Sequence, residues 1–215
     1  MNSRLKLSLS LLILAPLSLW ADDAATVRFT LDFPGANPSH YEIGVQQDGH
    51  GTYSSNGQFD EQSEPATSET LQFTLSGRVR DEIFDLTRHA GYFSSKVDSG
   101  HKNIANTGAK TLSYKDAQRA TSAKYNYSNM PPVERLTQIF QSLSTTLEYG
   151  RRLSYFHKYE KLALEADLKR MEELQKENSL GDVSAISAVL TSIANDPSVI
   201  NVSRTRALRL LASAK

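Results

Sequence analysis

The residue types that most often carry catalysis or bind metals are few in this sequence and widely scattered. The chain has no cysteine, and its five histidines are His40, His50, His89, His101 and His157. It contains no HExxH, GxSxG, Walker or GxGxxG segment. Glu172 and Glu173 lie in a run of mixed charge that is typical of a solvated helix. The sequence therefore predicts no catalytic residues, no metal site and no cofactor.

One segment does combine residue types that are common in binding surfaces. Basic and aromatic side chains alternate along it, and the candidate binding residues are Arg151, Arg152, Tyr155, Lys158 and Tyr159. Arginine and tyrosine are enriched at the centres of protein interfaces, so this segment is a candidate docking patch for an acidic protein surface or an anionic envelope lipid. The alternative is an ordinary solvated helix face. Docking predicts that Arg151→Glu/Arg152→Glu abolishes a partner interaction and leaves the melting temperature nearly unchanged.

These residues belong to a long stretch with helical periodicity, residues 131–175. Its apolar residues recur at spacings of three and four, which indicates a helix with one buried face. Asn129 is a candidate N-cap, and Pro131 and Pro132 suit a first helical turn. An unbroken helix of this length would measure roughly 68 Å at 1.5 Å per residue. We therefore expect either a bend at Gly150 or an arm that leaves the first domain.

The first 21 residues have the pattern of a secretory signal peptide. Arg4 and Lys6 precede an apolar stretch, residues 7–19, and Ala21 precedes two aspartates. The apolar stretch is shorter than the roughly 20 residues that span a membrane, so we expect cleavage and a bacterial periplasmic or secreted location. The whole chain has 24 basic and 24 acidic residues, and cleavage would remove only basic ones. A nucleic-acid partner and an integral membrane span are therefore not expected.

Residues 22–130 have the pattern of an antiparallel sheet with one packed helix. Apolar and polar residues alternate over residues 27–33, 41–45 and 71–75, as in half-buried strands. Asp48 and Gly49 predict a tight hairpin turn, and residues 110–114 and 120–127 predict a last hairpin. Ser76 and Gly91 are expected to bound an amphipathic helix. The polar stretches 54–67 and 94–108 are expected to be loops.

The sheet region also resembles a known group of proteins. The segments YEIGVQQDGHGTYSS and LTRHAGYFSS, followed by a hairpin and a helix that opens with prolines, are similar to a family of small exported bacterial domains of unknown function. The similarity spans residues 26–149. Pro38 and Tyr41 match the family pattern, whereas the cysteine pair that family members often carry is missing. The resemblance implies a fold and an exported location, and it implies no site residues.

The last segment, residues 176–215, predicts a helical hairpin. Asp182 is a candidate cap, the run Asn195–Asp196–Pro197 should end the first helix, and a second helix should follow from about Ser203. The segment resembles a single unit of a HEAT-type helical repeat. Because repeat arrays need about three or more units, we expect these helices to pack on the 131–175 segment instead.

The predicted fold is α+β, an antiparallel sheet with packed helices followed by a long helix and a C-terminal helical hairpin. Its expected parts are a signal peptide at 1–21, a sheet domain at 22–130, the long helix at 131–175, with Gly150 as the site of a bend if it is not straight, and the hairpin at 176–215.

The predicted function is a non-enzymatic binding or scaffolding module of the cell envelope, with an envelope protein as its partner. One alternative is an inhibitor-like domain that presents loops 54–67 and 94–108 to an enzyme. The other is a hydrolase whose site is assembled from residues far apart in the sequence. A deep pocket with converging polar groups would favour the hydrolase, whereas a flat apolar patch on residues 150–215 would favour the scaffold.

Overall fold

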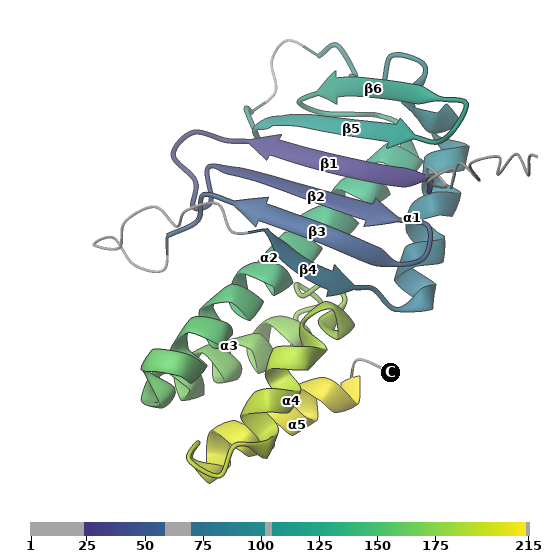
Figure 1. The fold of residues 1–215 in the computed structure, drawn as a ribbon. Helices are drawn as coiled ribbons and strands as arrows, with labels where there is room; N and C mark the ends of the chain where they lie inside the picture. Colours follow the sequence, from purple (N-terminus) through teal and green to yellow (C-terminus); the bar gives the residue numbers. More distant parts are fainter. Residues whose placement is uncertain (1–23, 59–69, 102–104, 214–215) are drawn as a thin grey trace, which may run out of the picture.

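The computed structural model describes residues 24–58, 70–101 and 105–213. The predicted signal peptide and most of loop 54–67 lie outside the described residues. Within them the α+β fold class is confirmed (Figure 1). Its two parts are a six-stranded sheet backed by two helices and a helical region that lies beyond one edge of the sheet. The helical region consists of residues 150–213, the end of the second of these helices and the chain that follows it.

The sheet is antiparallel throughout, with the strand order β4-β3-β2-β1-β5-β6. The strands are β1 (Thr26–Asp32), β2 (His40–Gln46), β3 (His50–Ser55), β4 (Leu71–Thr74), β5 (Ala109–Lys115) and β6 (Ala120–Tyr125). The predicted turn at Asp48 and Gly49 joins β2 to β3, and Gly49 adopts a φ of 93° that glycine tolerates. Both predicted hairpins are confirmed.

One face of the sheet is apolar because alternate residues of each strand point to the same side. Phe29, Ile43 and Leu112 lie on neighbouring strands in register and are fully buried. Helices α1 (Gly77–His89) and α2 (Pro131–Tyr159) cover this face, behind the strands in Figure 1. The Phe29 ring stacks on that of Phe140 in α2, with 5.2 Å between ring centroids. The main core of the sheet domain therefore lies between this face and the two helices.

Helix α1 begins and ends as its sequence predicts. The Ser76 hydroxyl accepts a hydrogen bond from the backbone N–H of Val79 at 3.4 Å. Gly91 has a φ of 62° directly after the helix, where it opens the short 3-10 turn η1 (Gly91–Phe93). Phe93 in this turn is 2% exposed and closes the core at the end of α1.

The start of α2 differs from the expected N-cap. Pro131 and Pro132 do occupy the first turn, but Met130 holds the cap position without a side-chain hydrogen bond. The side chain of Asn129 lies instead beside His101, with 3.3 Å between Nδ2 and Nε2. Ser128 organises this entry, because its hydroxyl accepts from the Met130 N–H and donates to the Val97 carbonyl. The Asn129 cap prediction was wrong, because Pro131 and Pro132 have no N–H to cap and the next two backbone N–H groups already donate to the Met130 carbonyl.

The long helix predicted at 131–175, with a bend at Gly150 or an arm leaving the first domain, is interrupted at Glu160 and not at Gly150. Helix α2 continues through Gly150 to Tyr159, and the chain reverses at Glu160, whose φ and ψ are −143° and 61°. Gly150 allows the segment that contains Ile186 to pack closely against α2, since a Cβ at Gly150 would lie 2.5 Å from the Cγ2 atom of Ile186. The turn η2 (Lys161–Ala163) then leads into α3 (Leu164–Lys176), which packs against α2.

The C-terminal helical hairpin is present and packs on the rest of the helical region. It consists of the turn η3 (Val183–Ile186) and helices α4 (Ser187–Asn195) and α5 (Asn201–Ser213). Asp182 caps η3 through the Ser184 N–H, and its second oxygen accepts from the Ser76 N–H at 2.7 Å. One carboxylate thus joins the helical region to the start of α1. Of the helices in the described residues, none is long and apolar enough to cross a membrane.

Candidate functional site

The five residues of the predicted docking patch lie on the last three turns of α2, but they face different surroundings. Arg151 points towards the end of β3, and its side chain is only 10% exposed. Its guanidinium donates to the Ser55 hydroxyl at 2.6 Å and to both oxygens of Glu148 at 3.0 Å. This arginine therefore joins the helix to the sheet.

Arg152 forms a two-pronged ion pair within the helical region. Its Nε and Nη2 atoms donate to the two carboxylate oxygens of Asp167 at 2.9 and 2.6 Å, and the Asp167 side chain is 8% exposed. A paired guanidinium is the partner that a buried carboxylate needs. Arg152 therefore holds α3 against α2. Reversing the charge of both arginines would break these bonds, so that variant tests folding as well as docking.

The other three candidate residues do lie on an exposed surface. The Tyr155 and Tyr159 rings are one helical turn apart with centroids 5.0 Å from each other, and the Lys158 Nζ atom lies 4.9 Å from the centre of the Tyr159 ring. Tyr159 is 61% exposed, and Leu162 in the following turn is 79% exposed. We call Tyr155, Lys158, Tyr159 and Leu162 the tip surface, because they lie where α2 ends and the chain reverses.

Exposed apolar side chains gather in the helical region beyond this tip surface as well. Ile200 lies just before α5, Val202 in its first turn and Leu208 near its middle, and they are 42%, 44% and 54% exposed. The exposure of these residues is hard to predict from the sequence. Leu208, for example, lies between Ala207 and Leu210, which are on the buried side of α5. Among the described residues of the sheet domain, Tyr127 is the large apolar side chain with comparable exposure.

A cluster of polar contacts beside the tip surface joins the end of α2 to the turn between α4 and α5. Lys161 Nζ and His157 Nε2 lie 2.7 and 2.9 Å from one oxygen of Asp196, and Ser198 donates to the other. The hydrogen bond from Lys161, supported by those from Ser198 and His157, holds the pKa of Asp196 well below its usual range. The turn predicted from Asn195–Asp196–Pro197 thus supplies an anchor for the end of α2.

A second polar cluster lies between β3 and α2 and bears on the enzyme alternative. The Tyr53 hydroxyl donates to Glu148 at 2.6 Å and lies 3.2 Å from the Ser144 hydroxyl. Burial, with Glu148 adding to it, raises the pKa of Tyr53. Glu148 also accepts from Ser55 and Arg151. The cluster contains residue types that catalyse reactions, but its five groups satisfy one another and join the sheet to the helix.

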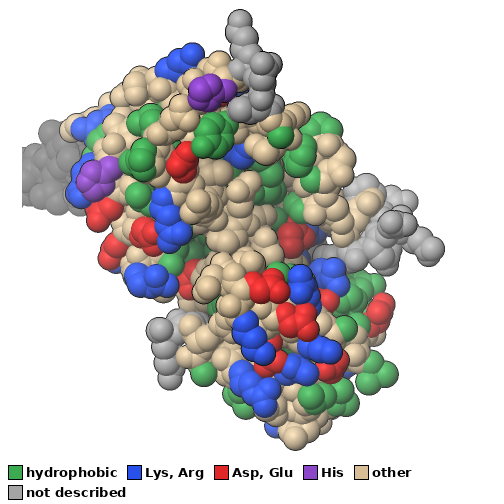
Figure 2. Space-filling view, turned by 180° about the vertical axis from the view of Figure 1, so that it is seen from behind, with side chains coloured by type: hydrophobic (Ala, Val, Ile, Leu, Met, Phe, Trp, Pro, Cys, Tyr) green, Lys and Arg blue, Asp and Glu red, His purple; other side chains and the backbone are tan. Residues whose placement is uncertain are grey.

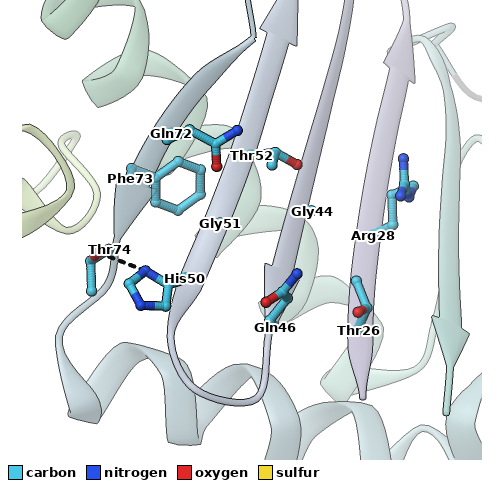
Figure 3. A pocket seen from close by; sticks show the side chains of 10 residues that line it. All are labelled: Thr26, Arg28, Gly44, Gln46, His50, Gly51, Thr52, Gln72, Phe73 and Thr74. Carbon is cyan, nitrogen blue, oxygen red and sulfur yellow. Dashed lines mark hydrogen bonds between the residues drawn. The ribbon is translucent and has the colours of Figure 1, made fainter. Parts of the chain in front are cut away.

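The opposite face of the sheet is uncovered and hollowed. A depression of about 430 Å³ lies on this face over strands β1 to β4, and Figure 3 shows the side chains that line it. It is lined by Thr26, Arg28, Gly44, Gln46, His50, Gly51, Thr52, Gln72, Phe73 and Thr74. His50 approaches Thr74, with 3.2 Å between Nδ1 and Oγ1. Sequence reasoning identified these strands but assigned no role to their solvent side.

The chain matches no family model, and no curated protein is significantly similar to it. The resemblance to small exported domains and to a HEAT-type unit therefore remains a prediction. In the part of the chain that the structure describes, no three His, Asp or Glu side chains are grouped to hold a metal ion.

Proposed function

We propose that this protein is an exported, non-enzymatic binding or scaffolding module of the bacterial cell envelope, and that it docks a partner protein through its helical region. The observation that carries the proposal is the distribution of exposed apolar side chains. Apart from Tyr127, the large apolar residues that are more than a third exposed in the described chain all lie in the helical region: Tyr155, Tyr159, Leu162, Ile200, Val202 and Leu208. Exposed apolar groups that cluster in one region are characteristic of binding surfaces.

The tip surface defines the chemistry of the partner. Two tyrosine rings and a leucine supply apolar contact area at small entropic cost, and Lys158 adds a positive charge beside Tyr159. An apolar patch bordered by acidic side chains on an envelope protein would complement this arrangement. The ion pairs around Arg152 and Asp196 hold the surface in place before binding, which lowers the cost of association.

The satisfied cluster at Tyr53 supports the non-enzymatic assignment over the hydrolase. A catalytic carboxylate or hydroxyl needs an open position for substrate, whereas Glu148 already accepts hydrogen bonds from Tyr53, Ser55 and Arg151. The inhibitor-like alternative depends on loops 54–67 and 94–108, parts of which lie outside the described residues.

Capture of partners after mild cross-linking tests the proposal. Tagged protein spanning residues 22–215 should be compared with the variant Tyr159→Ser/Leu162→Ser, which removes exposed apolar groups and leaves both arginines intact. A discrete envelope protein should be captured by the wild type and lost, by about tenfold or more, in the variant. Tyr127→Ser removes an exposed ring from the sheet domain and should capture the partner normally. Equal capture by all three proteins would overturn the proposal.

Export itself is tested separately by the mass of the native protein. If residues 1–21 are removed during secretion, protein recovered from the periplasm or medium should have the mass of residues 22–215 or a species a few residues shorter. Full-length protein in the cytoplasm would contradict the exported location.

A further inference from the structure

The two edges of the sheet differ in what lies beside them. At one edge, β4 has four residues and the helical region lies next to it (Figure 1). At the other edge, β6 has six residues and lies farthest from the helical region. Natural proteins protect edge strands with proline, bulges, charges or a covering segment, because their unpaired backbone groups can pair with another chain. Strand β6 contains no proline and one charged residue, Lys124, and it pairs with β5 without a bulge.

The backbone groups that β6 turns outwards belong to Ala120, Ser122 and Lys124. In an antiparallel pair, alternate residues exchange hydrogen bonds with the neighbouring strand, and the residues between them direct their N–H and carbonyl groups away from it. The Asp116 N–H donates to the Arg119 carbonyl. In the observed register, the odd-numbered residues of β6 are therefore the ones bonded to β5. Among the described residues, the outward groups of residues 120, 122 and 124 have no hydrogen-bond partner.

This open stretch is bounded at both ends by backbone N–H groups that are already bonded to carboxylates. Beyond Lys124, the N–H of Asn126 donates to Asp98 at 2.9 Å. Before Ala120, the N–H of Gln118 donates to Asp116 at 2.8 Å. The three open residues between these ends are therefore placed symmetrically about residue 122.

The side chains of the open stretch are small, so that a second strand can approach closely. Ala120 and Ser122 point to the uncovered face of the sheet, where both are exposed. Thr121 and Ala123 point to the helix side, where Thr121 donates to the Tyr92 carbonyl. A foreign peptide that adds as a strand gains its specificity from pockets for its alternate side chains, and side chains this small form only shallow ones. The edge favours a strand that matches it through the backbone.

We propose that β6 pairs with β6 of a second copy of this chain, antiparallel and about a two-fold axis at Ser122, so that the two six-stranded sheets become continuous. In this register Ser122 lies opposite Ser122 of the second copy, and Ala120 lies opposite its Lys124. Each open N–H of one copy then meets an open carbonyl of the other. This is the self-complementarity that a two-fold interface requires.

The hydrogen bonds at the ends of the open stretch select this register. A shift by two residues in one direction would pair residue 120 with Asn126, and a shift in the other direction would pair residue 124 with Gln118. Both Asn126 and Gln118 already use their N–H groups within their own copy. The register centred on Ser122 is the one that pairs open groups alone.

The charges of the strand permit this pairing. Lys124 lies opposite an alanine, and the two Lys124 residues are four positions apart along the strands, about 14 Å. Lys115 of the second copy lies on its β5 beside Ala120. It is two strand spacings from Lys124, about 10 Å, which is about one Debye length at moderate ionic strength. No like charges are therefore directly opposed.

The pairing also gives a partner to the exposed ring of Tyr127. This residue follows β6 and is 46% exposed. Because antiparallel pairing sets the end of one β6 against the start of the other, Tyr127 lies near the Asp116–Arg119 turn of the second copy. A strand pair with two such rings is small for a stable interface, so we expect a dissociation constant in the micromolar range.

This inference goes beyond the proposed docking function and does not depend on it. Strand β6 lies at the edge of the sheet farthest from the helical region (Figure 1), so the dimer leaves both tip surfaces uncovered. Two tip surfaces on one dimer would bind a partner that carries two matching sites more tightly than a single surface does.

A cysteine at position 122 tests the axis directly, because the chain has no cysteine of its own. In a hydrogen-bonded antiparallel pair the opposed Cα atoms are about 5.5 Å apart, a separation that a disulfide spans. Ser122→Cys should form a covalent dimer under oxidising conditions, seen on a non-reducing gel. Ser113→Cys is the matched control, since Ser113 lies beside Ser122 on β5, and it should remain monomeric. Equal yields of dimer from the two variants would overturn the proposal.

Sedimentation of the unmodified protein tests association without a cross-link. Residues 22–215 should shift from monomer towards dimer as the concentration rises to about 200 µM, as mass action requires. Ser122→Lys places two ammonium groups opposite each other at the axis and should weaken association about fivefold or more. Ser113→Lys adds the same charge one strand away and should associate like the wild type. A wild type that remains monomeric at the highest concentration would overturn the proposal.

Two further results separate this inference from other partners and from docking. If Ser122→Cys forms a disulfide in living cells with a cysteine of another envelope protein and none with itself, the edge binds that protein and the second-copy assignment is wrong. Tyr159→Ser/Leu162→Ser should dimerise normally, and Ser122→Lys should still capture the docked partner. Failure of the dimer and failure of docking are therefore distinguishable.

Discussion

The sheet domain and the helical region of this protein leave opposite kinds of side chain in solvent. The sheet domain buries its apolar groups between the strands and helices α1 and α2, and its uncovered face is polar. The helical region leaves tyrosine, leucine, isoleucine and valine exposed while an arginine–aspartate pair is partly buried. Two regions of one chain therefore offer different chemistry to their surroundings.

The polar contacts inside the two regions also differ. The core of the sheet domain contains buried tyrosines whose hydroxyls bond to neighbouring side chains. In the helical region, ion pairs join the helices, and Arg206 bridges Glu165 and Glu172 from α5 to α3. Seen from behind the sheet, acidic and basic side chains intermingle over this region (Figure 2). The comparison predicts that the two regions respond to different perturbations.

The largest expected effect is a loss of stability at high pH that arises in the sheet domain. Burial raises the pKa of Tyr41, Tyr53 and Tyr125, whereas in the unfolded chain tyrosines ionise near pH 10. The folded state then keeps protons that the unfolded state releases, so stability falls as the pH rises above about 10. Three such groups correspond to a slope of up to about 4 kcal/mol per pH unit. Urea unfolding at several pH values between 9 and 11 measures it.

A neighbouring lysine modifies the start of this decline. Burial lowers the pKa of Lys110, so its contribution raises stability with pH until the unfolded lysine also loses its proton near pH 10.4. The steep decline is therefore expected above that value. Tyr125→Phe should reduce the slope by about a third, and an unchanged slope in this variant would contradict the account.

Removal of Arg152 should be the most damaging single change in the helical region. Arg152→Ala leaves the Asp167 carboxylate, 8% exposed, without its charged partner. We expect the free energy of unfolding to fall by about 2–3 kcal/mol, the lower end for a broken buried pair because the arginine is partly solvated. Chemical denaturation measures the loss. Replacing both partners, as Arg152→Met/Asp167→Leu, should recover much of it, and failure to do so would show that the pair is not the cause.

The junction between the two regions should be sensitive to one methyl group. The Gly181 N–H donates to the Ser142 carbonyl and the Thr146 hydroxyl, and a Cβ would lie 2.6 Å from backbone atoms of Leu143. Gly181→Ala should therefore cost about 2 kcal/mol through overpacking. Gly77→Ala makes the same chemical change at the start of α1, where the nearest atom is 3.6 Å away. Thermal unfolding should show no loss there, and equal losses in both variants would contradict the packing argument.

The smallest expected effect concerns an exposed ion pair inside the sheet domain. Arg135 in α2 donates to Glu82 in α1 at 2.8 Å, but its side chain is 51% exposed. Exposed pairs of this kind contribute about 0.5 kcal/mol or less. Arg135→Ala should leave the melting temperature within about 2 °C of the wild type, and a larger shift would mean that solvent screens this pair less than its exposure implies.

The features that the sequence predicts correctly are those set by neighbouring residues. Alternation marks the strands, Asp48 and Gly49 mark the hairpin, and Ser76 and Gly91 mark the ends of α1, because strand pleating, turn geometry and capping all act over a few residues. The same local patterns place the C-terminal helices.

The features that it misses depend on contacts between distant segments. Arg151 bonds to Ser55, 96 residues away, so the composition of its own helix could not reveal that it faces the sheet. Gly150 carries the sequence signal of a bend, but its lack of a side chain lets Ile186 approach. Of the predicted patch, Tyr155, Lys158 and Tyr159 lie on an exposed surface, and Leu162 joins them only because the chain reverses at Glu160.

The central claim is that the tip surface docks an envelope protein, and a photo-crosslinking residue placed at position 159 in living cells tests it most directly. The control carries the same residue at position 141, which is exposed on α2 but lies two-thirds of the way back along the helix from the tip. The account predicts a discrete adduct of higher mass from position 159 and none from position 141. No adduct from position 159, or the same adducts from both positions, would contradict it.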